Sequence, residues 1–266
     1  MTALELEHVS RHFDTPDGRS YCALDEVSLV VPAGAFVAIV GPSGCGKSTL
    51  LNIAAGLLMP SSGRVRVDGE ALAGLNRRAT YMFQQDALLP WKNVRENVAL
   101  GLTLAGVARA EGHARADEWL ARVGLTTFAT HYPSQLSGGM RKRVTMAQNW
   151  IIDRGMLLMD EPFSALDVHT RQRMETELLT LWEATAGSAK KTVVFVTHDL
   201  EEAIALADEV VVLSAGPASR IVARHPVTLD RPRDLFELRT SAAFIDLYRA
   251  LWAVLRDEVI KSQRLA

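Results

Sequence analysis

The stretch that decides the fold is Gly41-Pro42-Ser43-Gly44-Cys45-Gly46-Lys47-Ser48, which fits the phosphate-loop pattern G-x-x-x-x-G-K-[ST]. It follows an apolar run, Phe36–Val40, and precedes a segment whose apolar residues recur at helical spacing. Glycines let backbone N–H groups turn toward phosphate oxygens, and a helix start directs its positive dipole end at an anion. Lys47 can neutralise terminal phosphates, and the Ser48 hydroxyl is a ligand that Mg²⁺ accepts.

Other apolar runs indicate a parallel sheet around this loop. Residues 156–159, 193–196 and 209–213 are apolar or nearly so without alternation, as in strands buried on both faces, and helix-like segments separate them. Such a chain is typical of an α/β fold with a mostly parallel sheet flanked by helices. Ligands bind at the carboxyl ends of the strands in these sheets.

Polar residues follow two of these strands. Asp160 suits the metal shell, directly or through water, and Glu161 suits a base that polarises an attacking water. An ordinary strand-end turn before Pro162 is the alternative interpretation. His198 either stabilises its own strand end or donates a hydrogen bond to a γ-phosphate.

Two regions depart from the parallel pattern. Residues 2–36 carry short β-like segments with turn signals at 16–18 and 32–34, which predicts an antiparallel sheet. Residues 93–152 are rich in Ala, Leu, Arg and Glu and predict a helical insertion. Within it, Leu136-Ser137-Gly138-Gly139-Met140 is a second glycine-rich turn that opens a helix. It either binds an anion and completes the site of another copy, or uses Ser137 as a plain N-cap.

Composition narrows the class of protein. The 266 residues are 48% hydrophobic and 23% charged, with a net charge of −2, which excludes a disordered chain and the basic footprint of a nucleic-acid binder. Two cysteines and no apolar run long enough to cross a bilayer predict a cytoplasmic protein. The first five residues lack the basic start and apolar core of a signal peptide.

Taken in order, the motifs resemble those of the ATP-binding subunits of ABC transporters. They are the phosphate loop (41–49), the Q-loop Phe83-Gln84-Gln85, the signature (136–140), the strand end at 157–161, the D-loop Ser164-Ala165-Leu166-Asp167 and the switch His198. The resemblance implies a P-loop NTPase domain over residues 4–236. It has an antiparallel β subdomain, a helical signature subdomain at about 88–152, and a short helical tail at 237–266.

The resemblance also assigns roles. It implies ATP hydrolysis with Mg²⁺, in which Glu161, His198 and Gln84 are catalytic and Ser48, Gln84 and Asp160 hold the metal. Two copies would sandwich two ATP molecules head to tail, so that the signature of one faces the γ-phosphate held by the other. The implied nucleotide contacts are Phe13 (with His12 as the competing adenine-stacking residue), Gly41, Pro42, Ser43, Gly44, Cys45, Gly46, Lys47, Ser48, Thr49, Ser137, Gly138, Gly139 and Asp167.

Three further sequence features resemble those of one group of importers. Met140 stands where the signature usually has Gln, and Leu88-Leu89-Pro90-Trp91 and Asp230-Arg231-Pro232-Arg233-Asp234 resemble the nitrate, sulfonate and taurine group. Thiamine-precursor pyrimidine importers share these features, so the solute stays open. A soluble, non-transport ABC ATPase and an inactive copy are weaker alternatives.

The implied partners are a second copy, two transmembrane permease subunits and, indirectly, a solute-binding protein, with no nucleic acid. The implied location is peripheral, on the cytoplasmic face of the inner membrane. Leu88, Leu89 and Trp91 either accept a short helix of a membrane subunit or pack inside the helical insertion. The tail has helical periodicity from Phe244 to Leu255 and covers either this chain's own sheet or a neighbour.

Overall fold

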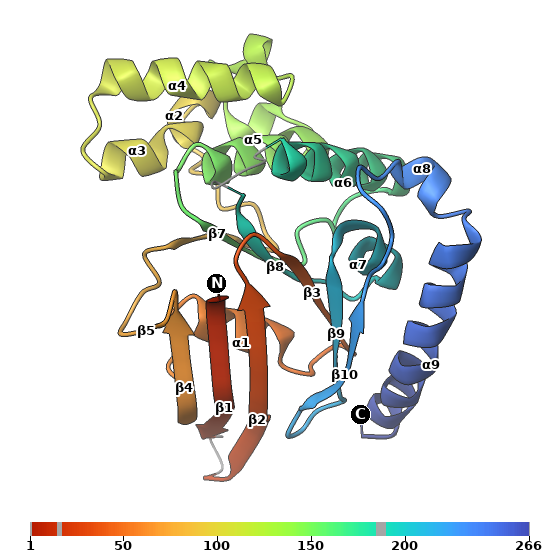
Figure 1. Cartoon of the computed structure of the whole chain (residues 1–266). Helices are drawn as coiled ribbons and strands as arrows, with labels where there is room; N and C mark the ends of the chain where they lie inside the picture. Colours follow the sequence, from red (N-terminus) through yellow and green to blue (C-terminus); the bar gives the residue numbers. More distant parts are fainter. Residues whose placement is uncertain (1, 15–17, 185–189, 266) are drawn as a thin grey trace.

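The computed structural model describes residues 2–14, 18–184 and 190–265. In this part of the chain, a central sheet of six strands has the order β10-β9-β3-β8-β7-β6. All its neighbours run parallel except β10 against β9 (Figure 1). The sheet confirms the expected α/β fold and all four apolar strands. Its members are β3 (Phe36–Val40), β6 (Ala79–Met82), β7 (Met156–Asp160), β8 (Thr192–Val196), β9 (Glu209–Leu213) and β10 (Ile221–Pro226).

A second, antiparallel sheet packs over one face of the first. Its described strands have the order β2-β1-β4-β5, namely β1 (Thr2–Asp14), β2 (Ser20–Pro32), β4 (Ser62–Val67) and β5 (Glu70–Ala71). Helix α1 (Lys47–Ala54) contributes Leu50, Leu51 and Ile53 to a core shared by both sheets. The expected antiparallel subdomain is therefore present. Of the expected turn at 16–18, residues 16 and 17 lie outside the described residues.

Helices cover the other face of the central sheet. They are α6 (Val168–Glu183), α7 (Leu200–Leu206), α8 (Leu235–Leu238) and α9 (Ala242–Leu265). Trp182 of α6 is fully buried and meets Phe36 of β3 edge-to-face, with ring centroids 5.4 Å apart. The tail helix α9 buries Phe244, Leu251 and Leu255 in this same core, so the tail covers its own chain (Figure 1).

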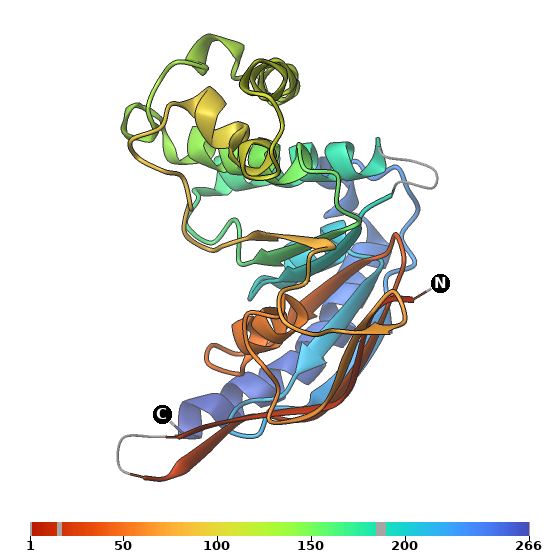
Figure 2. The ribbon, with the colours of Figure 1, turned by 90° about the vertical axis from the view of Figure 1, so that its left-hand side faces the viewer.

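The remaining helices gather at one end of the molecule, away from the antiparallel sheet (Figure 2). They are α2 (Val94–Val98), α3 (Leu100–Leu104), α4 (Arg109–Arg122), the 3₁₀ turns η1 (Thr126–Phe128) and η2 (Pro133–Gln135), and α5 (Gly138–Trp150). They share a core of their own. Leu88 is buried in that core, which agrees with the packing alternative for this residue, whereas Trp91 is 72% exposed and does not pack there.

No described helix is long and apolar enough to cross a membrane.

Candidate nucleotide site

The phosphate loop joins β3 to α1 with backbone conformations that favour glycine. Gly44 and Gly46 have φ of 77° and 88°, a region that side chains rarely adopt. A Cβ on Gly46 would lie 2.9 Å from Leu24 Cδ2, and one on Gly41 would lie 2.7 Å from Cys45 Sγ. Both positions therefore exclude a side chain by packing.

The Lys47 ammonium is held inside the loop. Its Nζ donates to the carbonyl oxygens of Gly41 at 2.9 Å and Pro42 at 3.0 Å. The same atom lies 3.9 Å from Glu161 Oε1, and the Lys47 side chain is only 5% exposed. The cation is thus positioned beside the loop by backbone acceptors that an anionic ligand can replace.

Two side-chain hydroxyl groups donate hydrogen bonds to the Asp160 carboxylate at the end of β7. Ser48 Oγ donates to Oδ1 at 2.9 Å, and the Tyr81 hydroxyl donates to Oδ2 at 3.3 Å. Burial raises the pKa of Asp160, which the two hydroxyl donors partly oppose. Tyr81, whose own pKa is raised mainly by burial, is a site residue that the motif pattern did not reveal.

These oxygen donors fit a magnesium ion that is shared with phosphate groups. Mg²⁺ prefers hard oxygen ligands and takes one or two from the protein, with substrate phosphates and water supplying the rest. The Ser48 hydroxyl and the Asp160 carboxylate converge on one point at the mouth of the loop. Among the described residues, no group of three or more His, Cys, Asp or Glu side chains forms a complete metal cage.

Glu161 and His198 meet at the same sheet edge. His198 Nδ1 lies 3.0 Å from Glu161 Oε2, and Glu161 has a φ of 41°, in the left-handed region. Such a conformation costs on the order of 1–3 kcal/mol and persists only when its surroundings impose it. The Glu161 N–H donates to the Val196 carbonyl at 2.9 Å, and the Ser164 hydroxyl donates to the Glu161 carbonyl at 3.0 Å.

Gln84 lies beside this pair. Its side-chain amide donates to Ser164 Oγ at 3.4 Å. The Gln84 carbonyl accepts from the buried Lys142 ammonium at 2.8 Å, and Asp86 Oδ1 lies 3.0 Å from the same ammonium. Lys142 of helix α5 thus fixes the backbone of the Q-loop. This contact joins distant segments, so no local motif predicted it.

A cavity of about 420 Å³ connects these groups. Its aromatic lining residues are Phe13 and Tyr21, which are paired across β1 and β2, and His12 is not among its lining residues. Tyr21 was not found from the sequence, because the β1–β2 register that places it opposite Phe13 becomes known only in the folded sheet. The cavity is lined by Phe13, Tyr21, Ala23, Ser43, Gly44, Gly46, Lys47, Ser48, Thr49, Gln84 and Glu161.

The signature turn lies outside this cavity lining. Ser137 Oγ accepts from the Met140 N–H at 3.3 Å and caps α5, so the N-cap interpretation describes its contact in the single chain. A Cβ on Gly139 would lie 2.7 Å from Thr170 Cγ2 on α6. Asp167 caps α6 by accepting from the Thr170 N–H at 3.0 Å. The signature and the D-loop therefore form one packed face.

Comparison with known proteins identifies the class. Residues 24–164 match the family model described as ABC transporter. A taurine import ATP-binding protein of Rhizobium johnstonii is 45% identical over 258 residues, which are 96% of this chain and 97% of that protein. An uncharacterised ABC transporter ATP-binding protein of Methanocaldococcus jannaschii is 43% identical and covers 97% of this chain and 93% of its own length.

Solved structures of ATP-binding cassettes have the same fold as this chain. The ATP-binding cassette MJ0796, solved as a dimer in a post-hydrolysis state bound to ADP and Pi, is 32% identical with a TM-score of 0.73. That match covers 85% of this chain and 100% of the cassette. The chain belongs to the ATP-binding proteins of ABC transporters. It is an ABC transporter ATPase, which binds ATP and couples its hydrolysis to transport.

Proposed function

We propose that this chain is the motor subunit of a solute importer and works as a head-to-tail pair with two shared ATP sites. The observation that carries the proposal is the incomplete cavity. The phosphate loop, Gln84 and Glu161 line it, while the signature turn caps a helix elsewhere in the chain. In the proposed pair, a second copy supplies Ser137, Gly138 and Gly139 to this cavity. The similar cassette MJ0796 was solved as a dimer, which supports pairing.

Each group then has a defined task in hydrolysis. The N–H groups of Gly41–Thr49 and the Lys47 ammonium bind the phosphates, and Phe13 stacks on adenine. Ser48, Asp160 and Gln84 would hold Mg²⁺, which would neutralise phosphate charge. Glu161 accepts a proton from the attacking water, and His198 orients Glu161 and contacts the γ-phosphate.

The geometry of the D-loop supports a trans contact. Asp167 is exposed at the start of α6, on the face that it shares with the signature turn. We place it against the partner's phosphate loop. We also assign residues 4–236 to the ATP-binding domain, about 88–152 to its helical subdomain, and 237–266 to the tail.

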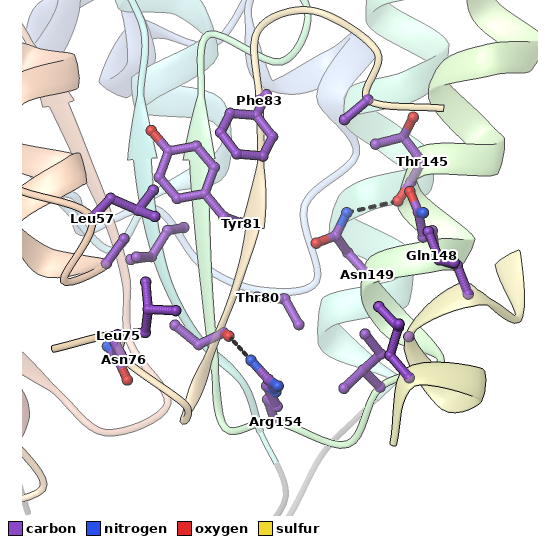
Figure 3. Close-up of a pocket in the computed structure, with 18 of the residues that line it drawn as sticks. Leu57, Leu75, Asn76, Thr80, Tyr81, Phe83, Thr145, Gln148, Asn149 and Arg154 are labelled. Atoms are coloured by element: carbon purple, nitrogen blue, oxygen red, sulfur yellow. Dashed lines mark hydrogen bonds between the residues drawn. The ribbon is translucent and has the colours of Figure 1, made fainter. Parts of the chain in front are cut away.

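A groove beside the Q-loop offers a docking place for the permease subunits. A cavity of about 490 Å³ lies between the sheet edge and the helical subdomain (Figure 3). Its large apolar side chains are unusually exposed: Leu57 is 51%, Leu75 is 63% and Phe83 is 44% exposed. Because Phe83 adjoins Gln84, a permease helix seated here contacts the Q-loop directly. In this proposal the subunit works peripherally, on the cytoplasmic face of the membrane.

The names of the relatives support one solute group. Several curated relatives are taurine import ATP-binding proteins, including one of Pseudomonas aeruginosa at 44% identity. We assign the importer to the nitrate, sulfonate and taurine group, with a solute-binding protein delivering the solute. Uptake into vesicles that contain the subunit with its copurified permease and binding protein tests this assignment. Faster ATP-dependent uptake of taurine or nitrate than of a thiamine-precursor pyrimidine supports the assignment, and faster uptake of the pyrimidine overturns it.

A mixing experiment tests the shared site. Lys47→Ala removes the cradle cation, and Ser137→Arg blocks the signature, so each purified variant has two defective sites. In a mixed head-to-tail pair one site contains both intact halves, so about a quarter of all sites recover after subunit exchange. ATP hydrolysis by the mixture above that of either variant supports the proposal, and hydrolysis that stays at the level of the separate variants refutes it.

A further inference from the structure

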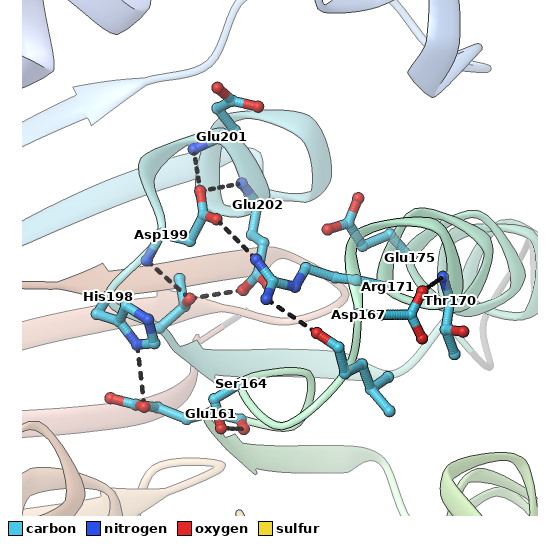
Figure 4. Close-up of polar contacts among 12 residues, drawn as sticks. Glu161, Ser164, Asp167, Thr170, Arg171, Glu175, His198, Asp199, Glu201 and Glu202 are labelled. Atoms are coloured by element: carbon cyan, nitrogen blue, oxygen red, sulfur yellow. Dashed lines mark hydrogen bonds and ion pairs between the residues drawn. The ribbon is translucent and has the colours of Figure 1, made fainter. Parts of the chain in front are cut away.

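A polar cluster behind the catalytic pair connects two loops that the proposed function uses separately. Arg171, on the first turn of α6, donates from Nη2 to the Leu166 carbonyl at 3.1 Å. Its Nη1 donates to Asp199 Oδ2 at 3.4 Å, and its Nε lies 3.6 Å from Glu202 Oε1 (Figure 4). One guanidinium therefore contacts the residue before Asp167 and the residue after His198.

Both residues that flank His198 are fixed by this cluster. Thr197 Oγ1 donates to Glu202 Oε2 at 2.6 Å and accepts from the Asp199 N–H at 3.0 Å. The Asp199 carboxylate also caps α7 by accepting the N–H groups of Glu201 and Glu202. His198 itself is more than half exposed, so its orientation depends on its neighbours along the chain and on Glu161.

The buried charged groups of this cluster add little to the free energy of unfolding, so stability alone does not account for them. Glu202 is 3% exposed, and burial raises its pKa to about 8. Glu175, which is fully buried, needs Arg239 at 2.5 Å as its partner. Buried ion pairs contribute little net stability compared with apolar packing, so their value lies more in fixing a unique geometry.

We propose that Arg171 is a positioning residue for ATP hydrolysis, which ties the Asp167 loop to the His198 loop so that the partner's contact with Asp167 sets the His198–Glu161 geometry. The inference rests on the head-to-tail pair of the proposed function. Arg171 touches neither the cavity lining nor the phosphate loop among the described contacts, so it acts through its neighbours. Asp199 carries the link on the His198 side.

The test compares Arg171→Met with Arg173→Met in the full-length chain. Arg173 lies on the same helix but is 69% exposed and pairs only with Glu177 among the described contacts, so it is a matched control. We expect Arg171→Met to slow single-turnover hydrolysis by about tenfold or more while the affinity for a fluorescent ATP analogue stays within about twofold. Arg171→Lys should recover part of the rate, and Arg173→Met should match the wild type.

A second variant separates positioning from folding. Asp199→Asn keeps an oxygen that can cap α7 but removes the charge that faces Arg171. We expect it to slow hydrolysis in the same sense, and the Arg171→Met/Asp199→Asn double variant to be no slower than the slower single variant. If Arg171→Met does not fold, the hydrolysis rate of Asp199→Asn decides whether the contact between Arg171 and Asp199 positions the catalytic pair.

The outcomes are distinguishable. Folded Arg171→Met that hydrolyses ATP at the wild-type rate overturns the inference, as do additive effects in the double variant. Wild-type protein that neither pairs nor hydrolyses ATP overturns the proposed function itself, independently of these variants. Equal losses in Arg171→Met and Arg173→Met also overturn the inference, because they indicate a general effect on α6.

Discussion

Adding a methyl group to Gly139 tests the packing of the signature turn against the D-loop helix. The new Cβ would lie 2.7 Å from Thr170 Cγ2, closer than two carbon atoms approach, so the Thr170 side chain or one of the helices α5 and α6 must shift. Overpacking of this kind costs about 1–3 kcal/mol. For a chain of this size, 1 kcal/mol corresponds to roughly 2–4 °C in the midpoint of thermal unfolding, so Gly139→Ala should lower it by about 2–12 °C.

The neighbouring glycine and the contacted threonine are the controls. A Cβ on Gly138 meets its nearest atoms at 3.8 Å and 3.9 Å, which is ordinary contact, so Gly138→Ala should not lower the midpoint. Thr170→Ser removes the obstructing methyl group and keeps the backbone N–H that Asp167 accepts. It should therefore restore most of the loss in the Gly139→Ala background, as an interaction term in a double-mutant cycle.

Differential scanning fluorimetry or circular dichroism without nucleotide measures the unfolding midpoints of the wild type, the three single variants and the Gly139→Ala/Thr170→Ser double variant. Omitting ATP separates packing within the chain from any contact between Gly139 and a bound phosphate. The reasoning is refuted if Gly139→Ala unfolds at the same temperature as Gly138→Ala, or if Thr170→Ser gives no recovery.

Three further predictions concern ligand and partner binding. Lys47→Ala removes a charge-assisted hydrogen bond to phosphate, so it should weaken ATP binding by about 1.5–3 kcal/mol or more. Titration calorimetry measures this change, and an unchanged affinity contradicts the assigned role. Phe13→Ala should weaken ATP binding by about 1–3 kcal/mol through lost base stacking, whereas His12→Ala should leave the affinity unchanged. Equal effects of the two substitutions would contradict the assignment of adenine stacking to Phe13. Trp91→Ala should leave the midpoint of thermal unfolding of the free subunit unchanged, because the side chain is 72% exposed, and should reduce copurification of the permease. A large drop in that midpoint would indicate core packing instead.

The sequence predicted the elements whose identity depends on local pattern. An apolar run such as Phe36–Val40 is compatible with burial on both faces of a sheet, and all five residues are buried. The glycines at Gly44 and Gly46 predicted a loop whose φ values are positive. Local chemistry was sufficient in both cases.

Contacts between distant segments could not be predicted in the same way. Tyr81 meets Asp160 across 79 positions, and Arg171 meets Asp199 across 28. Which side chains pair across such separations depends on strand order and helix packing. The short stretch around Leu88 and Trp91 shows the same limit, because two apolar residues outside a regular element do not reveal which one faces the core.

The central claim is that two copies close over ATP. The molecular mass of the Glu161→Gln variant in solution, with and without Mg-ATP, tests it most directly. Sedimentation or light scattering should show single chains without nucleotide and pairs with Mg-ATP, because the variant keeps the cradle but loses the hydrolytic carboxylate. The added Ser137→Arg change should abolish pairing. A Glu161→Gln protein that binds Mg-ATP and still remains a single chain, with permease present or absent, contradicts the account.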